Sequence, residues 1–230
     1  MTSGAPGDGS SLPVETHRIE VPRSARYCTA GGGGAVQEVW FLLHGYSMLA
    51  ERFIRWFSPA AAPDRLLVAP EALNLYYRNA REKRVGATWM TSEDREAHIG
   101  DYVRYLDLVR REVLGALGAA ARHEVHGFSQ GAATACRWVA FGENVPARLV
   151  LWGGLTPHDM DLSAHSARLS DAHLTLVIGD RDEYIPRAQV EAEEEKLKQA
   201  GVRYELRMFR GGHVIPWPEV RRLSGVNSVS

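Results

Sequence analysis

Serine, aspartate and histidine side chains that could together transfer an acyl group follow one another along this chain of 230 residues. The serine is Ser129, in the segment Gly127-Phe128-Ser129-Gln130-Gly131. A serine hydroxyl is a poor nucleophile at neutral pH, so it needs a base that takes its proton and a carboxylate that orients the base. We therefore interpret Ser129 as a candidate nucleophile and expect its two partners on later loops.

Glycines stand two positions before and two positions after Ser129, as a sharp turn from a strand into a helix requires. In such an elbow the nucleophile adopts a strained backbone conformation, and side chains at the glycine positions would collide with the neighbouring strand or helix. The preceding residues predict a strand at 124–126, and the small residues from Ala132 onwards predict a helix that lies close to a sheet. A purely structural glycine-rich turn is the alternative interpretation.

Three carboxylates compete for the orienting role in the loop after the apolar run 174–178. Asp180 comes directly after that run and is expected to cap the turn with its side chain, whereas Glu183 lies just before a helix. Asp182 lies deeper in the loop and can turn towards a histidine. Because a serine at an elbow is followed in chain order by the acid and then by the histidine, we favour Asp182.

His213 is the candidate base, because it comes last in chain order and follows Gly211 and Gly212, which let its loop swing towards the elbow. His126, just before the elbow, is expected to be structural, and His44 is expected to hold its own loop together. Six other histidines carry no signal: His17, His98, His123, His158, His165 and His173. Since the histidines are scattered, we predict no metal site and no cofactor.

Acyl transfer also needs backbone N–H groups that stabilise the negatively charged oxygen of the tetrahedral intermediate. Gln130, the residue after the nucleophile, is expected to supply one. The loop after Leu43-His44-Gly45 is expected to supply the other, from Tyr46. Among the apolar residues expected near the site, Tyr46, Trp89 and Trp217 are the candidate walls of a substrate pocket.

The charge balance excludes a general attraction to nucleic acid or to an anionic membrane. The net charge is −1, from 27 basic and 28 acidic residues. The basic cluster between Arg78 and Arg84 is a local exception, which we interpret as a solvated loop. No run approaches the roughly 20 apolar residues of a membrane span, and the N-terminus lacks the pattern of a signal peptide. We therefore expect a cytoplasmic protein, in which Cys28 and Cys136 do not pair.

Strands and helices are expected to alternate along the chain. Continuous apolar runs predict buried parallel strands, and an alternating pattern predicts a further strand with one exposed face. The predicted strands span 39–43, 66–68, 149–152, 174–178 and 202–208, with short early strands at 14–21 and 26–29. A capping box at 91–94 precedes one long helix, a second helix spans 186–200, and a last one begins near Pro216 or Pro218.

This order of elements predicts an α/β fold with a mostly parallel central sheet and helices on both of its faces. We expect a disordered tail at 1–12, one domain at 13–224 and a flexible tail at 225–230. About twenty residues separate the strands that end at 152 and begin at 173, too few for a large lid domain.

Four motifs together resemble the small α/β-hydrolases of the phospholipase/carboxylesterase family, which includes the acyl-protein thioesterases. They are Leu43-His44-Gly45, the elbow, Gly179-x-x-Asp182-x-x-x-Pro186 and Gly212-His213, and the resemblance spans residues 37 to about 222. It implies the α/β-hydrolase fold, a triad of Ser129, Asp182 and His213, and oxyanion donors at Tyr46 and Gln130. Two departures stand out. Tyr46 is bulkier than the family's usual first-loop residue, which would narrow the acyl pocket, and Glu183 replaces the proline that usually follows the acid.

These observations predict a serine carboxylesterase that cleaves small to medium acyl esters through an acyl-enzyme on Ser129. The apolar surroundings of the site favour an uncharged small molecule, an acyl or aryl ester. An acyl-thioesterase or a lysophospholipase with the same triad is the alternative, since only the pocket selects among these acyl groups. A hydrolase fold that binds a small molecule without catalysis is a further alternative.

Overall fold

The computed structural model describes residues 13–79, 81–117 and 121–225, and its centre is a seven-stranded sheet. The strands lie in the order β1-β3-β2-β6-β7-β8-β9. Neighbouring strands run parallel except β1, which pairs antiparallel with β3. Their bounds are Tyr27–Gly31 (β1), Glu38–Leu43 (β2), Arg65–Pro70 (β3), Arg122–Phe128 (β6), Arg148–Trp152 (β7), Leu174–Gly179 (β8) and Tyr204–Phe209 (β9). The predicted mostly parallel sheet is confirmed.

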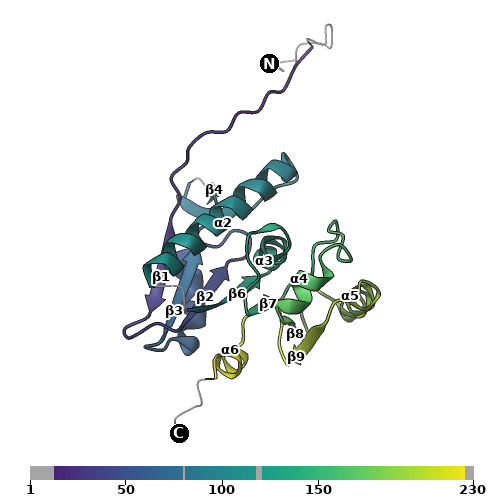
Figure 1. Ribbon diagram of the computed structural model, residues 1–230. Coiled ribbons are helices and arrows are strands. Elements are labelled where there is room, and N and C mark those ends of the chain that lie inside the picture. The colour runs from purple at the N-terminus through teal and green to yellow at the C-terminus, as the bar shows by residue number, and fades with distance from the viewer. Residues whose placement is uncertain (1–12, 80, 118–120, 226–230) are drawn as a thin grey trace.

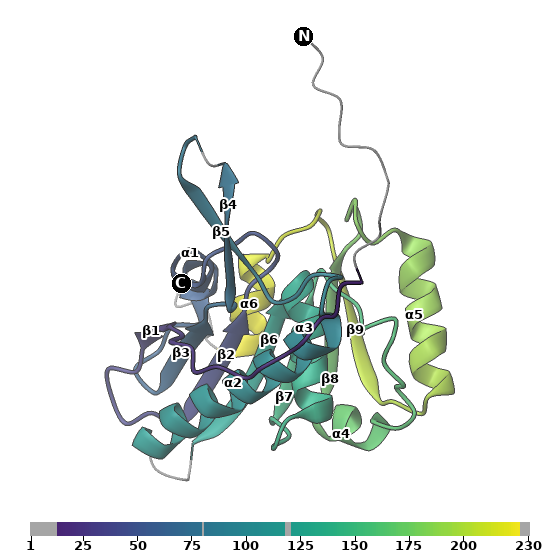
Figure 2. The same ribbon diagram turned by 90° about the horizontal axis from the view of Figure 1, so that it is seen from above.

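Helices cover both faces of the sheet (Figures 1 and 2). One face is covered by α2 (Arg95–Leu117), α3 (Gln130–Phe141), α4 (Ser166–Asp171) and α5 (Arg187–Gln199). The other is covered by α1 (Ala50–Phe53), the 3₁₀ helix η1 (Ile54–Ala60) and α6 (Trp217–Ser224). In β2, Val39 and Phe41 pack on the first face and Trp40 and Leu42 on the second. Burial on both faces explains the continuous apolar runs of the central strands.

A β-hairpin stands outside the sheet and extends away from the rest of the molecule (Figure 2). It consists of β4 (Asn74–Asn79) and β5 (Arg84–Thr88), which pair antiparallel. We expected this basic segment to be a solvated loop, and that prediction was wrong about its backbone. Because most side chains of β4 are exposed, the sequence lacks the alternation of apolar and polar residues that marks a half-buried strand.

The strand expected at 14–21 does not form. No strand pairs with this segment, and its large apolar side chains are exposed. Instead, ion pairs connect it to α2 and to the residue before α2: Arg18 with Asp94, and Glu20 with Arg104. Because Val14, Ile19 and Val21 stay exposed, this segment buries no apolar face of the kind that a strand would pack on the core.

The chain between β7 and β8 forms one short helix, α4, and no large additional domain is present in the described part of the chain. The tail predicted at 1–12 lies outside the described residues. The tail predicted at 225–230 does so too, apart from Gly225, whose left-handed backbone ends α6.

Three further properties concern only the residues that the structure describes. None of their helices is both long and apolar enough to cross a membrane. They hold no group of three or more histidine, cysteine, aspartate or glutamate side chains that could bind a metal ion. Both cysteines are free thiols, and burial of Cys136 in α3 raises the pKa of its thiol to about 12.

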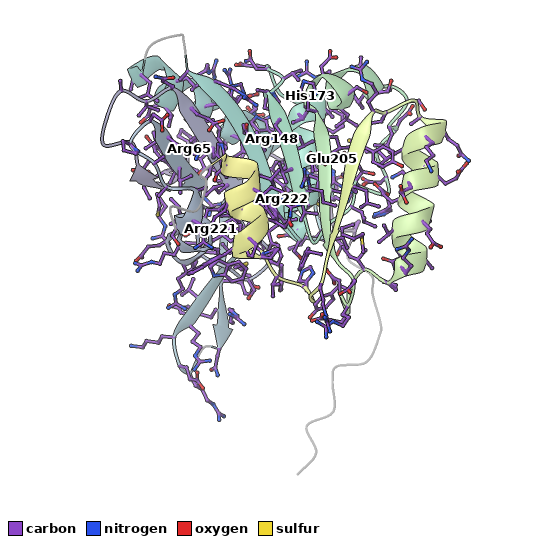
Figure 3. The ribbon with its side chains drawn as sticks, turned by 90° about the horizontal axis from the view of Figure 1, so that it is seen from below. Arg65, Arg148, His173, Glu205, Arg221 and Arg222 are labelled. Carbon is purple, nitrogen blue, oxygen red and sulfur yellow. The ribbon has the colours of Figure 1, made fainter. Side chains whose placement is uncertain are left out.

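Two arginines of the sheet hold the C-terminal end of α6, and both lie beside that end of the helix in Figure 3. Arg65 donates from Nη2 to the Ser224 carbonyl at 2.7 Å, and Arg148 donates from Nη2 to the Leu223 carbonyl at 2.8 Å. Arg148 is itself fixed by the fully buried Glu124, with 2.8 Å between its Nε and Oε2 of the carboxylate. These contacts fix α6 and, through it, the loop that leads from β9 to the helix.

His126 is buried beside Glu124 inside the sheet, in the structural role expected of it. The Trp152 indole N–H donates to its Nδ1 at 3.2 Å, so its proton lies on Nε2, which is 3.3 Å from Glu124 Oε2. Burial lowers the pKa of His126. Burial opposes ionisation of Glu124, but hydrogen bonds from His126 and Arg148 outweigh it and lower the pKa of its carboxyl to about 2.

Glu124→Gln is expected to destabilise the protein at neutral pH and to weaken its sensitivity to acid. The folded-state pKa of Glu124 is below the ordinary 4.5, so the carboxylate stabilises the fold above about pH 4.5 and this stability is lost as the pH falls towards 2. The contribution is roughly 3 kcal/mol. Urea unfolding of wild type and variant at about pH 7, 5 and 3 measures it, and the difference in unfolding free energy should shrink at the lowest pH.

His126 also lowers the unfolding free energy in acid, both in wild type and in Glu124→Gln. Its pKa is lowered in the folded state, so stability is lost as the pH falls below the ordinary value of 6.5. Glu205→Gln is the matched control, because Glu205 is an exposed carboxylate paired with Arg207 and should contribute less than about 1 kcal/mol. A Glu124→Gln effect that stays constant down to the lowest pH would contradict this assignment.

Candidate active site

Ser129 occupies the turn between β6 and α3. Its φ of 53° and ψ of −118° lie outside the regions that a non-glycine residue normally adopts. Its N–H donates to the Trp152 carbonyl at 3.0 Å, so β7 holds the strained residue in place. Because Gln130 is the first residue of α3, the unpaired N–H groups of the helix N-terminus lie next to the half-buried serine.

The glycines on either side of Ser129 are required by close backbone contacts. A Cβ atom at position 127 would overlap the Gly131 carbonyl oxygen and lie 2.7 Å from the Ala132 Cα. A Cβ atom at position 131 would overlap the Leu43 carbonyl oxygen and lie 2.6 Å from the His44 carbonyl oxygen. The missing side chains let α3 approach β2 and β6 closely enough to form the elbow.

Gly131→Ala is expected to destabilise the protein by about 3 kcal/mol or more, because two backbone carbonyls would have to move. The control is Gly115→Ala in the exposed part of α2, where a Cβ atom meets nothing within 4 Å. That substitution should stabilise the protein by up to about 1 kcal/mol, since alanine favours the helix. Urea unfolding measures both, and a Gly131→Ala protein as stable as the control would contradict the close contact.

Asp182 and His213 form a hydrogen-bonded pair. The distance from Asp182 Oδ2 to His213 Nδ1 is 2.9 Å. The other carboxylate oxygen, Oδ1, accepts from the backbone N–H groups of Tyr184 at 2.9 Å and Ile185 at 3.2 Å. The aspartate is buried and both of its oxygens are occupied, so it can hold the imidazole in one orientation with Nε2 free for another partner.

The other two carboxylates of the loop take different positions. Asp180 accepts from the Gly211 N–H at 2.9 Å, so its side chain joins the two loops at their base, as expected of a turn-capping residue. Glu183 is exposed, and neither residue bonds the imidazole of His213. Of the three candidates weighed from the sequence, the structure places Asp182 against the histidine.

Two consecutive glycines after β7 lie against the site, Gly153 beside His213 and Gly154 beside Ser129. A Cβ atom on Gly153 would lie 3.1 Å from His213 Nδ1, and one on Gly154 would lie 3.1 Å from the Ser129 carbonyl oxygen. The ring of Phe128, next to the serine, lies 4.8 Å from the His213 ring between centroids. The structure thus brings the serine, the histidine and its aspartate together at the carboxyl end of the sheet, where ligands of open α/β sheets bind.

The loop after β2 lies beside Ser129. A Cβ atom on Gly45 would be 3.3 Å from the Ser129 Cβ. The next N–H group, of Tyr46, has no hydrogen-bond acceptor within the described ranges. The Gln130 N–H at the start of α3 has none within its helix. Among the described residues, neither of these two amides has an acceptor, and they flank the serine from two different elements.

The Tyr46 side chain packs against the hairpin, and its narrowing of an acyl pocket stays a prediction. It is more than half exposed and stacks on Tyr76 of the hairpin, with 5.6 Å between ring centroids. The hairpin is attached at the same place, because the Ser47 N–H donates to the Ala87 carbonyl at 2.8 Å. This loop therefore has its backbone beside Ser129 and its aromatic side chain outside, against the hairpin.

Trp89 lies in the core and not at a pocket wall, so that expectation is corrected. Its side chain is 1 % exposed, and its indole N–H donates to the His44 carbonyl at 2.8 Å. Trp89 therefore supports the loop after β2 from inside the protein. Trp217 is half exposed at the start of α6 and stays a candidate for contact with substrate.

Two features of the site carried no signal in the sequence. Trp56 of η1 is 36 % exposed and its ring lies 5.6 Å from that of Phe128, but η1 is too short for a recognisable helical pattern. The Gln130 side chain accepts from the Trp89 N–H at 3.1 Å and donates to the Met90 carbonyl at 3.0 Å. This amide therefore ties the start of α3 to the end of β5.

Comparison with known proteins places the chain in a family. A model of the phospholipase/carboxylesterase family matches residues 29–225. The chain belongs to this family. The resemblance stated from four sequence motifs is thereby confirmed, and with it the α/β-hydrolase fold.

Solved structures share the fold of this phospholipase/carboxylesterase family member over most of its length. Esterase PE8 is 23% identical, covers 87% of this chain and 96% of its own, and has a TM-score of 0.69. Acyl-protein thioesterase 2 of Zea mays is 18% identical, with coverages of 88% and 97% and a TM-score of 0.68. A carboxylesterase of Mesorhizobium loti is 18% identical, with coverages of 88% and 95% and a TM-score of 0.69. No curated protein sequence matches the chain.

Proposed function

We propose that this protein is a serine carboxylesterase that cleaves small to medium acyl esters, with Ser129 as nucleophile, His213 as base and Asp182 as the acid that orients it. The observation that carries the proposal is the 2.9 Å bond between Asp182 Oδ2 and His213 Nδ1, next to a serine held at a φ of 53°. Membership in the phospholipase/carboxylesterase family supports the same chemistry.

In the proposed reaction, the Ser129 oxygen bonds to the carbonyl carbon of the ester while His213 Nε2 takes the hydroxyl proton. The negative charge on the carbonyl oxygen is stabilised by the N–H groups of Tyr46 and Gln130. The bond to the leaving oxygen then breaks, and that oxygen takes the proton from His213. Water, deprotonated by His213, attacks the acyl carbon; the bond between this carbon and the Ser129 oxygen then breaks, the oxygen takes the proton back from His213, and the acid is released.

An uncharged acyl or aryl ester fits the surroundings best. The exposed ring of Tyr184 lies 4.7 Å from the His213 ring between centroids, and the partly exposed ring of Trp56 packs on Phe128, which itself contacts His213. Such a surface gains most from apolar groups, because their burial is favourable without a compensating charge. Trp217 is a further candidate contact.

The test is hydrolysis of p-nitrophenyl butyrate by the purified protein. We expect release of p-nitrophenol that depends on Ser129, with a higher kcat/KM than for palmitoyl thioesters or lysophospholipids. A thioesterase is the second candidate, because acyl-protein thioesterase 2 of Zea mays is among the structures that share this fold. A palmitoyl thioester as the best substrate would favour that candidate, and a lysophospholipid would favour a lysophospholipase.

A hydrolase fold that only binds a small molecule predicts a different outcome. A fluorophosphonate reacts with a serine that is activated by a neighbouring base. Failure of this probe to label the wild-type protein, together with no turnover of any of the three substrates, would favour the binding module and contradict the proposed esterase.

A further inference from the structure

Glu71 is a buried carboxylate near the site that the proposed mechanism does not use. Glu71 directly follows β3, and its side chain is 5% exposed. Burial favours its neutral form, but the contacts with His44, Ala50 and Arg26 outweigh burial and hold the pKa of the carboxyl below its ordinary value. Burying a charge costs desolvation free energy, so a buried carboxylate is stable only where its partners compensate for that cost.

Glu71 contacts both ends of the loop that carries Tyr46. Its Oε1 accepts from the Ala50 N–H at 3.0 Å, where the loop enters α1. The same oxygen lies 3.3 Å from Nε2 of the fully buried His44, where the loop leaves β2. That nitrogen accepts from the backbone N–H of Ala72, the residue after Glu71, at 3.1 Å. The segment of Glu71 and Ala72 thus contacts both ends of the loop.

His44 transmits this constraint to the residue beside the serine. Its Nδ1 lies 2.8 Å from the Gly45 carbonyl oxygen, to which it donates. Since a Cβ atom on Gly45 would be 3.3 Å from the Ser129 Cβ, a tilt of this peptide would move the next N–H group, of Tyr46, relative to the nucleophile. Glu71 itself contacts neither Tyr46 nor Ser129 among the contacts of the described residues.

The same network also reaches the second proposed oxyanion donor. The His44 carbonyl accepts from the Trp89 indole at 2.8 Å, and the Trp89 backbone N–H donates to the Gln130 side chain at 3.1 Å. A continuous chain of contacts therefore runs from Glu71 through His44 and Trp89 to Gln130. It joins the two backbone segments whose amides must converge on one oxygen atom.

We propose that Glu71 is a positioning residue for the oxyanion site, which acts through His44 and Ala50 to place the Tyr46 N–H. The inference rests on the proposed esterase function. Because an oxyanion donor is used in the transition state and not in the bound ester, loss of Glu71 should lower kcat and leave KM nearly unchanged. Misplacement of a reacting group by about 1 Å costs on the order of 10²-fold, and we expect a loss of that size for Glu71→Ala.

The experiment compares wild type, Glu71→Ala and Glu71→Gln with p-nitrophenyl butyrate as substrate. A trifluoromethyl ketone with the same acyl chain is the second probe, since its adduct with serine carries the oxyanion. For Glu71→Ala we expect kcat to fall about 10²-fold, KM to change less than about threefold and the inhibition constant of the ketone to rise by about the same factor as kcat falls. Glu71→Gln should recover part of the loss, because its amide oxygen can still accept from Ala50.

Acetate provides an additional readout. Glu71 lines a surface cavity of about 240 Å³ together with Arg23 and Arg26. Acetate added to Glu71→Ala can reach the vacated position through this cavity and should raise kcat, with no effect on wild type. A general loss of stability would not respond in this way.

Glu51→Ala is the matched control. Glu51 is an exposed carboxylate in α1, next to Ala50. Among the described residues, its only ion-pair partner is Arg55. Its removal should leave kcat and the ketone inhibition unchanged. If Glu71→Ala does not fold, the same comparison of kcat, KM and ketone inhibition in Glu71→Gln decides the matter, with a smaller expected loss of kcat.

Folded Glu71 variants that keep kcat within threefold of wild type would overturn the inference, as would a loss that appears in KM alone. The wild type separates this failure from a failure of the proposed function. A wild-type protein without esterase turnover or fluorophosphonate labelling contradicts the proposed function, whereas an active wild type with equally active Glu71 variants contradicts only the role of Glu71.

Discussion

Ser129→Ala is expected to reduce kcat/KM for p-nitrophenyl butyrate by roughly 10⁴- to 10⁶-fold. Alanine cannot form the acyl-enzyme, so only transition-state stabilisation by the remaining groups would be left. The loss should appear in kcat, because the ester can still bind beside the exposed rings of Tyr184 and Trp56. Steady-state kinetics over a range of substrate concentrations measures it.

The fold should be unaffected by this substitution, since the Ser129 backbone contact to the Trp152 carbonyl does not involve the side chain. Ser166→Ala is the control and should keep wild-type activity. Among the described residues, the Ser166 hydroxyl donates only to the Ser163 carbonyl, at the surface. Circular dichroism and thermal unfolding verify that both variants are folded. Turnover by Ser129→Ala near the wild-type level would assign the reaction to another residue.

The second large effect is expected for Asp182→Asn, with a loss in kcat of roughly 10³- to 10⁴-fold. Asp182 Oδ1 now accepts from two backbone N–H groups, and the side-chain oxygen of the introduced asparagine would keep these bonds. The asparagine NH₂ group would then face His213 Nδ1. That contact favours the imidazole tautomer with its proton on Nε2, and such a histidine cannot take the proton of Ser129. Steady-state kinetics with p-nitrophenyl butyrate measures the loss.

Asp180→Asn distinguishes orientation from a general effect of charge in this loop. The side-chain oxygen of asparagine can still accept from the Gly211 N–H, as Asp180 does at 2.9 Å, so the loop should keep its conformation. We expect kcat to stay within about fivefold of wild type, since Asp180 has no contact with His213. A larger loss for Asp180→Asn than for Asp182→Asn would reverse the assignment of the acid.

The sequence predicts most of the sheet and the order of the candidate catalytic residues, because both depend on local patterns. The runs at 39–43 and 149–152 are apolar because their strands are buried on both faces. The elbow requires glycine at positions 127 and 131 because the neighbouring backbone leaves no space for a side chain. Signals of this kind act over a few residues, and the structure contains the corresponding elements β2, β7 and α3.

What the sequence does not predict depends on contacts between distant segments. Glu71 reaches Ala50 and Arg26 across 21 and 45 residues, so no local pattern distinguishes it from a surface carboxylate. Trp89 has the residue type of a pocket wall but lies under the loop after β2. The hairpin of β4 and β5 is held mainly by its own pairing, so it shows no periodic apolar face.

The most direct test of the proposed site is reaction of the wild-type protein with a fluorophosphonate, followed by intact mass measurement and peptide mapping. We expect one adduct per chain, located on Ser129, and a rate of labelling that falls at least about 10²-fold in His213→Ala, because the base that activates the serine is then missing. An adduct on a different residue, or labelling of Ser129 at the same rate with and without His213, would contradict a nucleophile activated by this histidine.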